Sequence, residues 1–239
     1  MTWSMVAHDP QTGAFAVAVT TAAFAVGASC PFLRSGVGAV STQSLTNRYL
    51  GPAILDRIGR GFAPAAAIED ALATDAGRHV ARCMRSTGTG RAAAWTGRQC
   101  VAWCGERTGV HMSVAGNMLA GPAVVDATFD ATGKQGELAL PERLLAALDA
   151  GQGMGGDRRG RQSAAMLLTT TEDFPDLDIR VDDHPEPLAE LRRLLGIWRA
   201  QALARRMWAP TKASPSGVTD LDAIERAWRE KGLDIRFPR

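Results

Sequence analysis

The start of the chain carries a residue that can act as a nucleophile. Thr2 directly follows Met1. Removal of Met1 would leave one residue with both a hydroxyl group and an α-amine, whose ordinary pKa of about 7.7–8.0 lets it accept the hydroxyl proton near neutral pH. This pair of groups would suit attack on an amide carbonyl. A structural role for Thr2 as an early strand residue explains the same position, because a single hydroxyl is a weak signal of catalysis.

Two further stretches place polar side chains where strands are expected to end. Thr42 and Gln43 close an apolar run that begins at Gly36, and Asn117 follows Gly116. An asparagine amide in a cleft can donate a hydrogen bond to an oxyanion, and Thr42 and Gln43 are candidate substrate-binding residues. Both positions are equally explained by turns, since asparagine readily adopts left-handed backbone geometry beside glycine.

The segment 151–163 has the composition of a ligand-binding loop. It contains five glycines, Asp157 and three arginines, followed by Gln162. Guanidinium groups bind carboxylates and phosphates, so Arg158, Arg161 and Gln162 are predicted to bind substrate, with Asp157 orienting an arginine or the amine. Because no Gly-Lys-Ser/Thr follows and the glycines precede a strand, the segment is neither a phosphate loop nor a dinucleotide loop. A solvated basic loop is the alternative.

A third candidate site lies at the end of a later strand. Asp182 and Asp183 precede His184, and two carboxylates beside an imidazole could ligate a divalent metal or support acid–base chemistry. A capped turn before a helix that begins near Pro187 explains these residues as well. The four cysteines lack the two matched pairs of a zinc site, and we expect neither a resident metal nor a cofactor.

Alternating strands and helices must position these candidates. Apolar periodicity predicts the following elements: strands over 3–8, 14–20, 36–43, 80–85, 92–96, 100–104, 111–115, 164–168 and 177–182, and helices over 49–58, 64–74, 124–131, 141–152, 187–207 and within 219–239. The many short strands indicate antiparallel sheet, so the fold class is α+β. We expect one domain over 1–208 and a linker with a helical tail over 209–239.

Composition narrows the classes of function. The chain has 239 residues, is 46% hydrophobic and carries a formal net charge of +2, so we expect no nucleic-acid partner. It has neither an apolar run long enough to span a bilayer nor a secretory leader, which favours a cytoplasmic protein without a membrane partner. A small-molecule substrate is therefore expected. The apolar helix face around Trp198 suggests a homo-oligomer.

Several of these stretches together resemble one bacterial family. They are Thr2-Trp3-Ser4-Met5-Val6-Ala7, Ala25-Val26-Gly27, Gly36-Val37-Gly38-Ala39-Val40-Ser41-Thr42-Gln43, Gly116-Asn117-Met118-Leu119, Gly155-Gly156-Asp157-Arg158-Arg159-Gly160-Arg161-Gln162-Ser163 and Arg180-Val181-Asp182-Asp183-His184-Pro185. The family they resemble is number 1028 among the domains of unknown function, DUF1028, which is classed with the N-terminal nucleophile (Ntn) hydrolases. The resemblance covers about Met1 to Leu195 and implies a four-layer αββα sandwich, here with a C-terminal helical extension.

The resemblance also implies an activity. Relatives in that superfamily hydrolyse amide bonds through an N-terminal Thr, Ser or Cys, and Thr2 falls at the matching place. Proteasome-like members use a lysine beside the nucleophile, but this chain has no lysine before Lys134. The amidase type, with the α-amine as base and Asn117 as oxyanion donor, is the better match.

The expected function is therefore hydrolysis of a small carboxylate- or ureido-bearing amide. Two alternatives stay open at this point. One is a non-catalytic small-molecule binding protein on the same fold. The other is a divalent-metal hydrolase that uses Asp182, Asp183 and His184.

Overall fold

A computed structural model describes residues 2–134, 138–202 and 206–232. The chain forms two compact units, one ending at Arg192 and the other beginning at Arg193. Helix α5 (Pro187–Ile197) runs across that boundary. The domain limit that the sequence suggests, after residue 208, stays a prediction.

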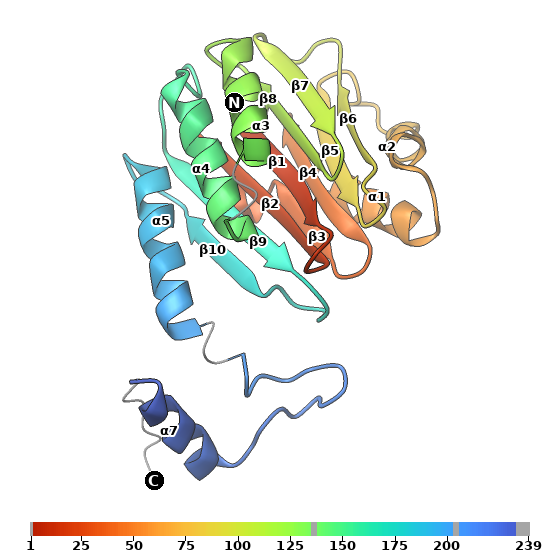
Figure 1. Ribbon diagram of the computed structural model, residues 1–239. Coiled ribbons are helices and arrows are strands. Elements are labelled where there is room, and N and C mark those ends of the chain that lie inside the picture. Colours follow the sequence, from red (N-terminus) through yellow and green to blue (C-terminus); the bar gives the residue numbers. More distant parts are fainter. Residues whose placement is uncertain (1, 135–137, 203–205, 233–239) are drawn as a thin grey trace. The chain divides into compact units, whose positions relative to one another are not determined.

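Two antiparallel sheets form the centre of the first unit (Figure 1). The six-stranded sheet has the order β10-β9-β2-β1-β8-β7, and the four-stranded sheet has the order β3-β4-β5-β6. The strands are β1 (Thr2–Asp9), β2 (Ala14–Thr21), β3 (Pro31–Arg34), β4 (Gly38–Ser44), β5 (Ala81–Thr87), β6 (Ala92–Thr96), β7 (Cys104–Gly109), β8 (Met112–Asn117), β9 (Ser163–Thr169) and β10 (Leu177–Val181). The two sheets pack face to face and share one apolar core. This core contains Val6, Phe15 and Val17 from the six-stranded sheet and Ala39 and Met84 from the four-stranded sheet.

Helices cover the outer faces of both sheets. Helices α1 (Leu50–Gly59) and α2 (Pro64–Leu72) pack on the four-stranded sheet, and α3 (Pro122–Lys134) and α4 (Leu140–Gly153) pack on the six-stranded sheet (Figure 1). Each buries an apolar stripe, as Leu144, Leu145 and Leu148 do on α4. These layers confirm the predicted α+β class and the αββα sandwich.

The structure departs from the predicted elements in three places. Strand β3 was not predicted, because four residues that begin with Pro31 give little periodicity. The strand expected over 100–104 begins only at Cys104, since the tight hairpin between Gly109 and Met112 sets the register of β7. The helix expected to reach Met207 is α-helical only to Ile197, where a short π-helix (Trp198–Ala202) follows.

The second unit contains one further α-helix among its described residues. This helix, α7 (Leu221–Glu230), begins where the Asp220 side chain accepts a hydrogen bond from the Ala223 amide (3.0 Å). It buries Ile224 and Trp228. The predicted C-terminal helical extension is therefore present.

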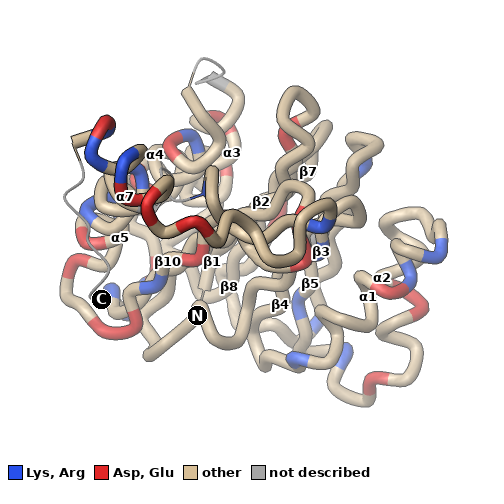
Figure 2. Tube along the Cα trace, turned by 90° about the horizontal axis from the view of Figure 1, so that it is seen from below, with Lys and Arg blue, Asp and Glu red and all other residues tan. Residues whose placement is uncertain are grey.

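Basic and acidic residues are interspersed along the chain. Figure 2 shows basic and acidic positions interspersed over the trace, in agreement with the net charge of +2. Among the described residues, no helix combines the length and the apolar character needed to cross a bilayer.

Candidate functional site

One row of polar side chains crosses the six-stranded sheet at the end where β1 begins. Its members, which we call the end row, are Cys104, Asn117, Thr2, Thr21 and Ser163, from β7, β8, β1, β2 and β9. Thr2 pairs with Asn117 in the β1–β8 ladder. On the other side of β1, the Thr2 hydroxyl donates a hydrogen bond to Oγ1 of Thr21 (3.2 Å). The fold therefore places the predicted nucleophile beside the predicted oxyanion donor.

The end row faces the space between the two sheets. Side chains two residues apart on a strand share a face, so Thr2 lies on the same face as Ser4. The Ser4 hydroxyl reaches the opposite sheet, where it contacts Oγ of Ser41 (2.9 Å) and donates to Oε1 of Gln43 (2.8 Å). Trp3 points the other way, toward α4, where a Cβ at Gly151 would come within 3.1 Å of its indole nitrogen.

The central residues of the end row are buried. Thr2 is 7% exposed and Asn117 is 1% exposed. Within the described part of the chain, Oδ1 of Asn117 accepts no hydrogen bond although it is buried. A buried polar atom without a partner costs about 1–3 kcal/mol. In native proteins a ligand or a water molecule often completes such an atom, which makes Asn117 a candidate binding position.

Asp157 links the two segments that follow β2 and β8, next to the start of β1. Strand β1 lies between β2 and β8, and Asp157 contacts the segments that follow both neighbours. Its carboxylate accepts a hydrogen bond from the Ala22 amide (2.8 Å), and its backbone forms a bridge with Leu119. The amide of Arg159 (2.9 Å) and its guanidinium donate to the same carboxylate. The arginine that Asp157 orients is therefore Arg159.

The two predicted residues of β4 lie on opposite faces. Gln43 faces the six-stranded sheet, where its Nε2 donates to the carbonyl of Ala115 (3.2 Å). Thr42 pairs with Cys83, and Cys83 packs in the core under α1 and α2. Since neighbouring strand residues alternate in direction, Thr42 points away from the end row. The structure does not bring Thr42 together with Thr2.

The loop residues predicted to bind substrate lie at the surface or half-buried. Arg161 forms an ion pair with Glu186, and Gln162 donates to Asp183 (3.2 Å). Arg158 donates to the backbone carbonyl of Ala102 (3.3 Å). Among the ion pairs of the described residues, none involves Arg158, so its guanidinium is available to an anionic ligand.

The segment predicted as an alternative metal site is engaged in turn contacts. Nδ1 of His184 accepts a hydrogen bond from the Glu186 amide (3.0 Å), and Asp183 accepts the bond from Gln162. Across residues 2–134, 138–202 and 206–232, no three His, Cys, Asp or Glu side chains gather in an arrangement that could hold a metal ion. The capped-turn interpretation therefore describes this segment best.

Comparison with known proteins agrees with this fold. A family model described as "Family of unknown function (DUF1028)" matches residues 2–191. The chain belongs to the DUF1028 family. The crystal structure of protein SPO2555 from Silicibacter pomeroyi, also of DUF1028, is 29% identical with a TM-score of 0.84, covering 92% of this chain and 96% of that one.

More distant structures share only a weak likeness. Anbu (ancestral beta-subunit) from Yersinia bercovieri and an Anbu (Gly-1) mutant from Hyphomicrobium sp. strain MC1 each align over 86% of this chain and 97% of their own, at 11% identity. Their TM-scores of 0.37 and 0.42 are too low to support a functional argument. No curated protein matches this DUF1028 chain.

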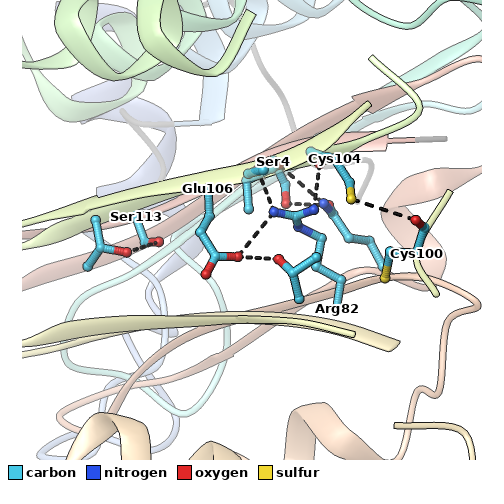
Figure 3. Close-up of polar contacts among 12 residues, drawn as sticks. Ser4, Arg82, Cys100, Cys104, Glu106 and Ser113 are labelled. Atoms are coloured by element: carbon cyan, nitrogen blue, oxygen red, sulfur yellow. Dashed lines mark hydrogen bonds and ion pairs between the residues drawn. The ribbon is translucent and has the colours of Figure 1, made fainter. Parts of the chain in front are cut away.

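Besides Cys104 and Ser163 of the end row, sequence reasoning missed two further polar residues of this DUF1028 site. One is Thr21, whose place opposite Thr2 follows only from the strand register. The other is Arg82 on β5, which is 1% exposed and reaches across to the six-stranded sheet (Figure 3). Burial lowers the pKa of the Arg82 guanidinium, and the carboxylate of Glu106 opposes that effect. An arginine in a short strand carries no sequence signal of burial.

A cavity of about 340 Å³ lies elsewhere in the fold, beside Leu33, Ser35, Thr169 and Phe174. Strand β9 runs from Ser163 in the end row to Thr169, so this cavity adjoins the opposite end of the sandwich. The Ser35 hydroxyl there already donates to the carbonyl of Thr170 (2.8 Å). The end row holds the predicted nucleophile and the predicted oxyanion donor, so we place the candidate site there.

Proposed function

We propose that this DUF1028 chain is an amidohydrolase of the N-terminal nucleophile type that acts after removal of Met1. Oγ1 of Thr2 attacks the carbonyl carbon of the amide, and the freed α-amine of Thr2 takes the hydroxyl proton and returns it to the leaving amine. A water molecule, deprotonated by the same amine, then hydrolyses the acyl ester on Oγ1 and restores the Thr2 hydroxyl. The side-chain amide of Asn117 donates to the developing oxyanion. The observation that supports this most is the pairing of Thr2 with Asn117 on one buried face.

Neighbouring hydroxyls hold the nucleophile and the loop beside it. Thr21 accepts the hydrogen bond of the Thr2 hydroxyl, which sets the direction of Oγ1. Ser163 donates to the carbonyl of Ala23 (2.6 Å) and accepts from the amide of Val26 (3.1 Å), so it fixes the loop after β2. Preorganised groups of this kind keep the reacting atoms near attack geometry.

The substrate we propose is a small amide that carries a carboxylate or ureido group. Arg158 supports this because its guanidinium is exposed beside the loop that carries Asp157 and has only a backbone carbonyl as partner in the described structure. A planar guanidinium binds such groups through two parallel hydrogen bonds. Arg161 could bind the substrate only if it released Glu186. Gln162 could do so only if it released Asp183.

The test begins with the mass of the native protein and needs no known substrate. We expect a mass that lacks Met1, and acylation of Thr2 by a β-lactone probe. Thr2→Ala should abolish the adduct, whereas Thr12→Ala, in the turn between β1 and β2, should leave it intact. Full retention of Met1 together with an unlabelled Thr2 would contradict the proposal and favour a non-catalytic binding protein.

A further inference from the structure

We infer that Arg82 is a positioning residue that holds Asn117 in place for the reaction. This inference rests on the proposed function. Arg82 belongs to β5 of the four-stranded sheet, but its side chain ends against β7 and β8 of the other sheet (Figure 3). Its position opposite Gln43 in the β4–β5 ladder directs it into the space between the sheets.

The contacts of Arg82 converge on one pair of backbone carbonyls. Nη1 donates to the carbonyl of Gly116 (2.6 Å), and Nη2 donates to the carbonyl of Gly105. Gly105 and Gly116 are opposite each other in the β7–β8 ladder. The next pair in that ladder is Cys104 and Asn117, so the guanidinium binds the sheet one residue from the end row.

The Gly116 contact constrains Asn117 directly. The carbonyl of Gly116 and the amide nitrogen of Asn117 belong to the same planar peptide unit. Fixing the carbonyl therefore fixes the orientation of the backbone from which the Asn117 side chain extends. Gly116 is also closely packed on the other face of the sheet, where a Cβ would lie 2.8 Å from Cβ of Trp3.

A carboxylate holds the guanidinium in this position. Oε2 of Glu106 accepts from Nη2 of Arg82 (3.2 Å) and also from the Thr96 hydroxyl (Figure 3). The Arg82 side chain is fully buried, so removal of this counter-ion would leave an uncompensated buried charge. Lysine would keep the charge but could not reproduce the planar fork that binds two carbonyls and a carboxylate together.

The first test observes Asn117 itself. Asn47 and Asn117 are the asparagines of the chain, so selective ¹⁵N-asparagine labelling gives two side-chain amide signals. Arg82→Lys should shift the Asn117 signal and leave unchanged that of Asn47, which is half-buried and accepts a hydrogen bond from the Tyr49 amide before α1. Glu106→Gln should move Asn117 in the same direction, which covers the case in which Arg82→Lys does not fold. An unmoved Asn117 signal in a folded variant would overturn the inference.

The second test measures how fast the β-lactone probe acylates Thr2. Arg82→Lys should slow acylation about tenfold to a hundredfold, as small displacements of positioned groups do. In an Asn117→Ala background the same substitution should have almost no further effect, because Arg82 acts through Asn117. Additive effects would indicate a merely structural role and overturn the inference. Arg34→Lys, at an exposed ion pair with Asp56, is the matched control and should leave the rate unchanged.

The two failures can be told apart. An unlabelled Thr2 in the wild-type chain would contradict the proposed function. In that case the Asn117 amide signal still reports whether Arg82 holds Asn117.

Discussion

At the scale of single residues, the site depends on which strand positions face each other. Thr2 is 115 residues from Asn117 in the sequence, yet they form one pair in the β1–β8 ladder. A register slip of one residue would turn Thr2 toward α4 and put Trp3 between the sheets. The glycine that precedes Asn117 is part of this fit, because it packs directly against Trp3.

Gly116→Ala should destabilise the fold by about 1–3 kcal/mol. A Cβ at Gly116 would lie 2.3 Å from Cδ1 of Leu119 and 2.8 Å from Cβ of Trp3, so the end of β8 must shift. Chemical denaturation of both proteins measures the loss. Gly121→Ala is the control, since a Cβ there meets no atom within 4 Å and should change stability by less than about 0.5 kcal/mol. Equal losses would show that close contact at Gly116 is unimportant.

A second prediction concerns His8 and His111. Nδ1 of His8 lies 2.9 Å from Nδ1 of His111. Burial, and then the nearby His111, lower the pKa of His8, while Asp9 acts in the opposite direction. The folded chain thus binds this proton more weakly than the unfolded chain. The free energy of unfolding should be constant above about pH 6.5 and decline as the pH falls toward the lower folded pKa.

Denaturant titrations between pH 5 and 8 would measure this dependence. His8→Gln should remove most of the decline, because glutamine does not titrate. His184→Gln, on the turn before α5, should keep the wild-type dependence. A His8→Gln variant with an undiminished decline would show that other groups cause it.

At the scale of elements, the loop 154–162 covers the end of the six-stranded sheet that carries the end row. Asp157 contacts both the segment after β2 and the segment after β8. Among the described residues of the loop, it alone forms hydrogen bonds or bridges with both segments. Asp157→Ala should leave the Ala22 amide without its acceptor and speed its hydrogen exchange about tenfold or more, since an unmade buried bond costs about 1–3 kcal/mol.

The control for this prediction is Asp178→Ala. Asp178 pairs with Arg180 on the exposed face of β10, where an ion pair contributes about 0–1 kcal/mol. It should leave the exchange of Ala22 unchanged. If Asp157→Ala also leaves that exchange unchanged, the carboxylate is not what holds the loop.

Local pattern was enough to predict many of these elements. The β1–β2 hairpin followed from two apolar runs around a turn in which Gly13 adopts a φ of 72°. Helix α4 followed from its leucine spacing and the proline in its first turn. The predicted bounds of β7 and of the end of α5 differ from the observed ones. Hairpin register and a change from α-helix to π-helix leave no periodic pattern in the sequence from which they could be predicted.

The site was only partly predictable for a related reason. Thr2, Asn117 and Asp157 are marked by their positions next to Met1 or among glycines. Arg82 and Thr21 acquire their roles only through long-range pairing, which depends on tertiary structure. Thr42 and Gln43 show the limit most simply: adjacent residues with similar polarity lie on opposite faces of β4.

At the scale of the whole molecule, α5 gives less support for self-association than its sequence suggests. Leu188, Leu191 and Leu195 are buried within the chain rather than exposed along an apolar face. Residues that are already covered cannot form a surface for a second copy. The homo-oligomer stays a prediction, and sedimentation analysis of the full chain would test it.

The final prediction concerns the domain limit. A chain that ends after Trp208 should fold, with the Asn117 amide signal unchanged and a Tm within about 4 °C of the full chain, corresponding to about 1 kcal/mol. The reason is that every residue of the end row lies before Arg192, in the first compact unit, and α5 is retained whole. A chain that ends after Arg192 provides the contrast, because it cuts α5 in its middle and should unfold at a lower temperature. If the chain that ends after Trp208 also moved the Asn117 signal, residues beyond 208 would belong to the domain that carries the candidate site.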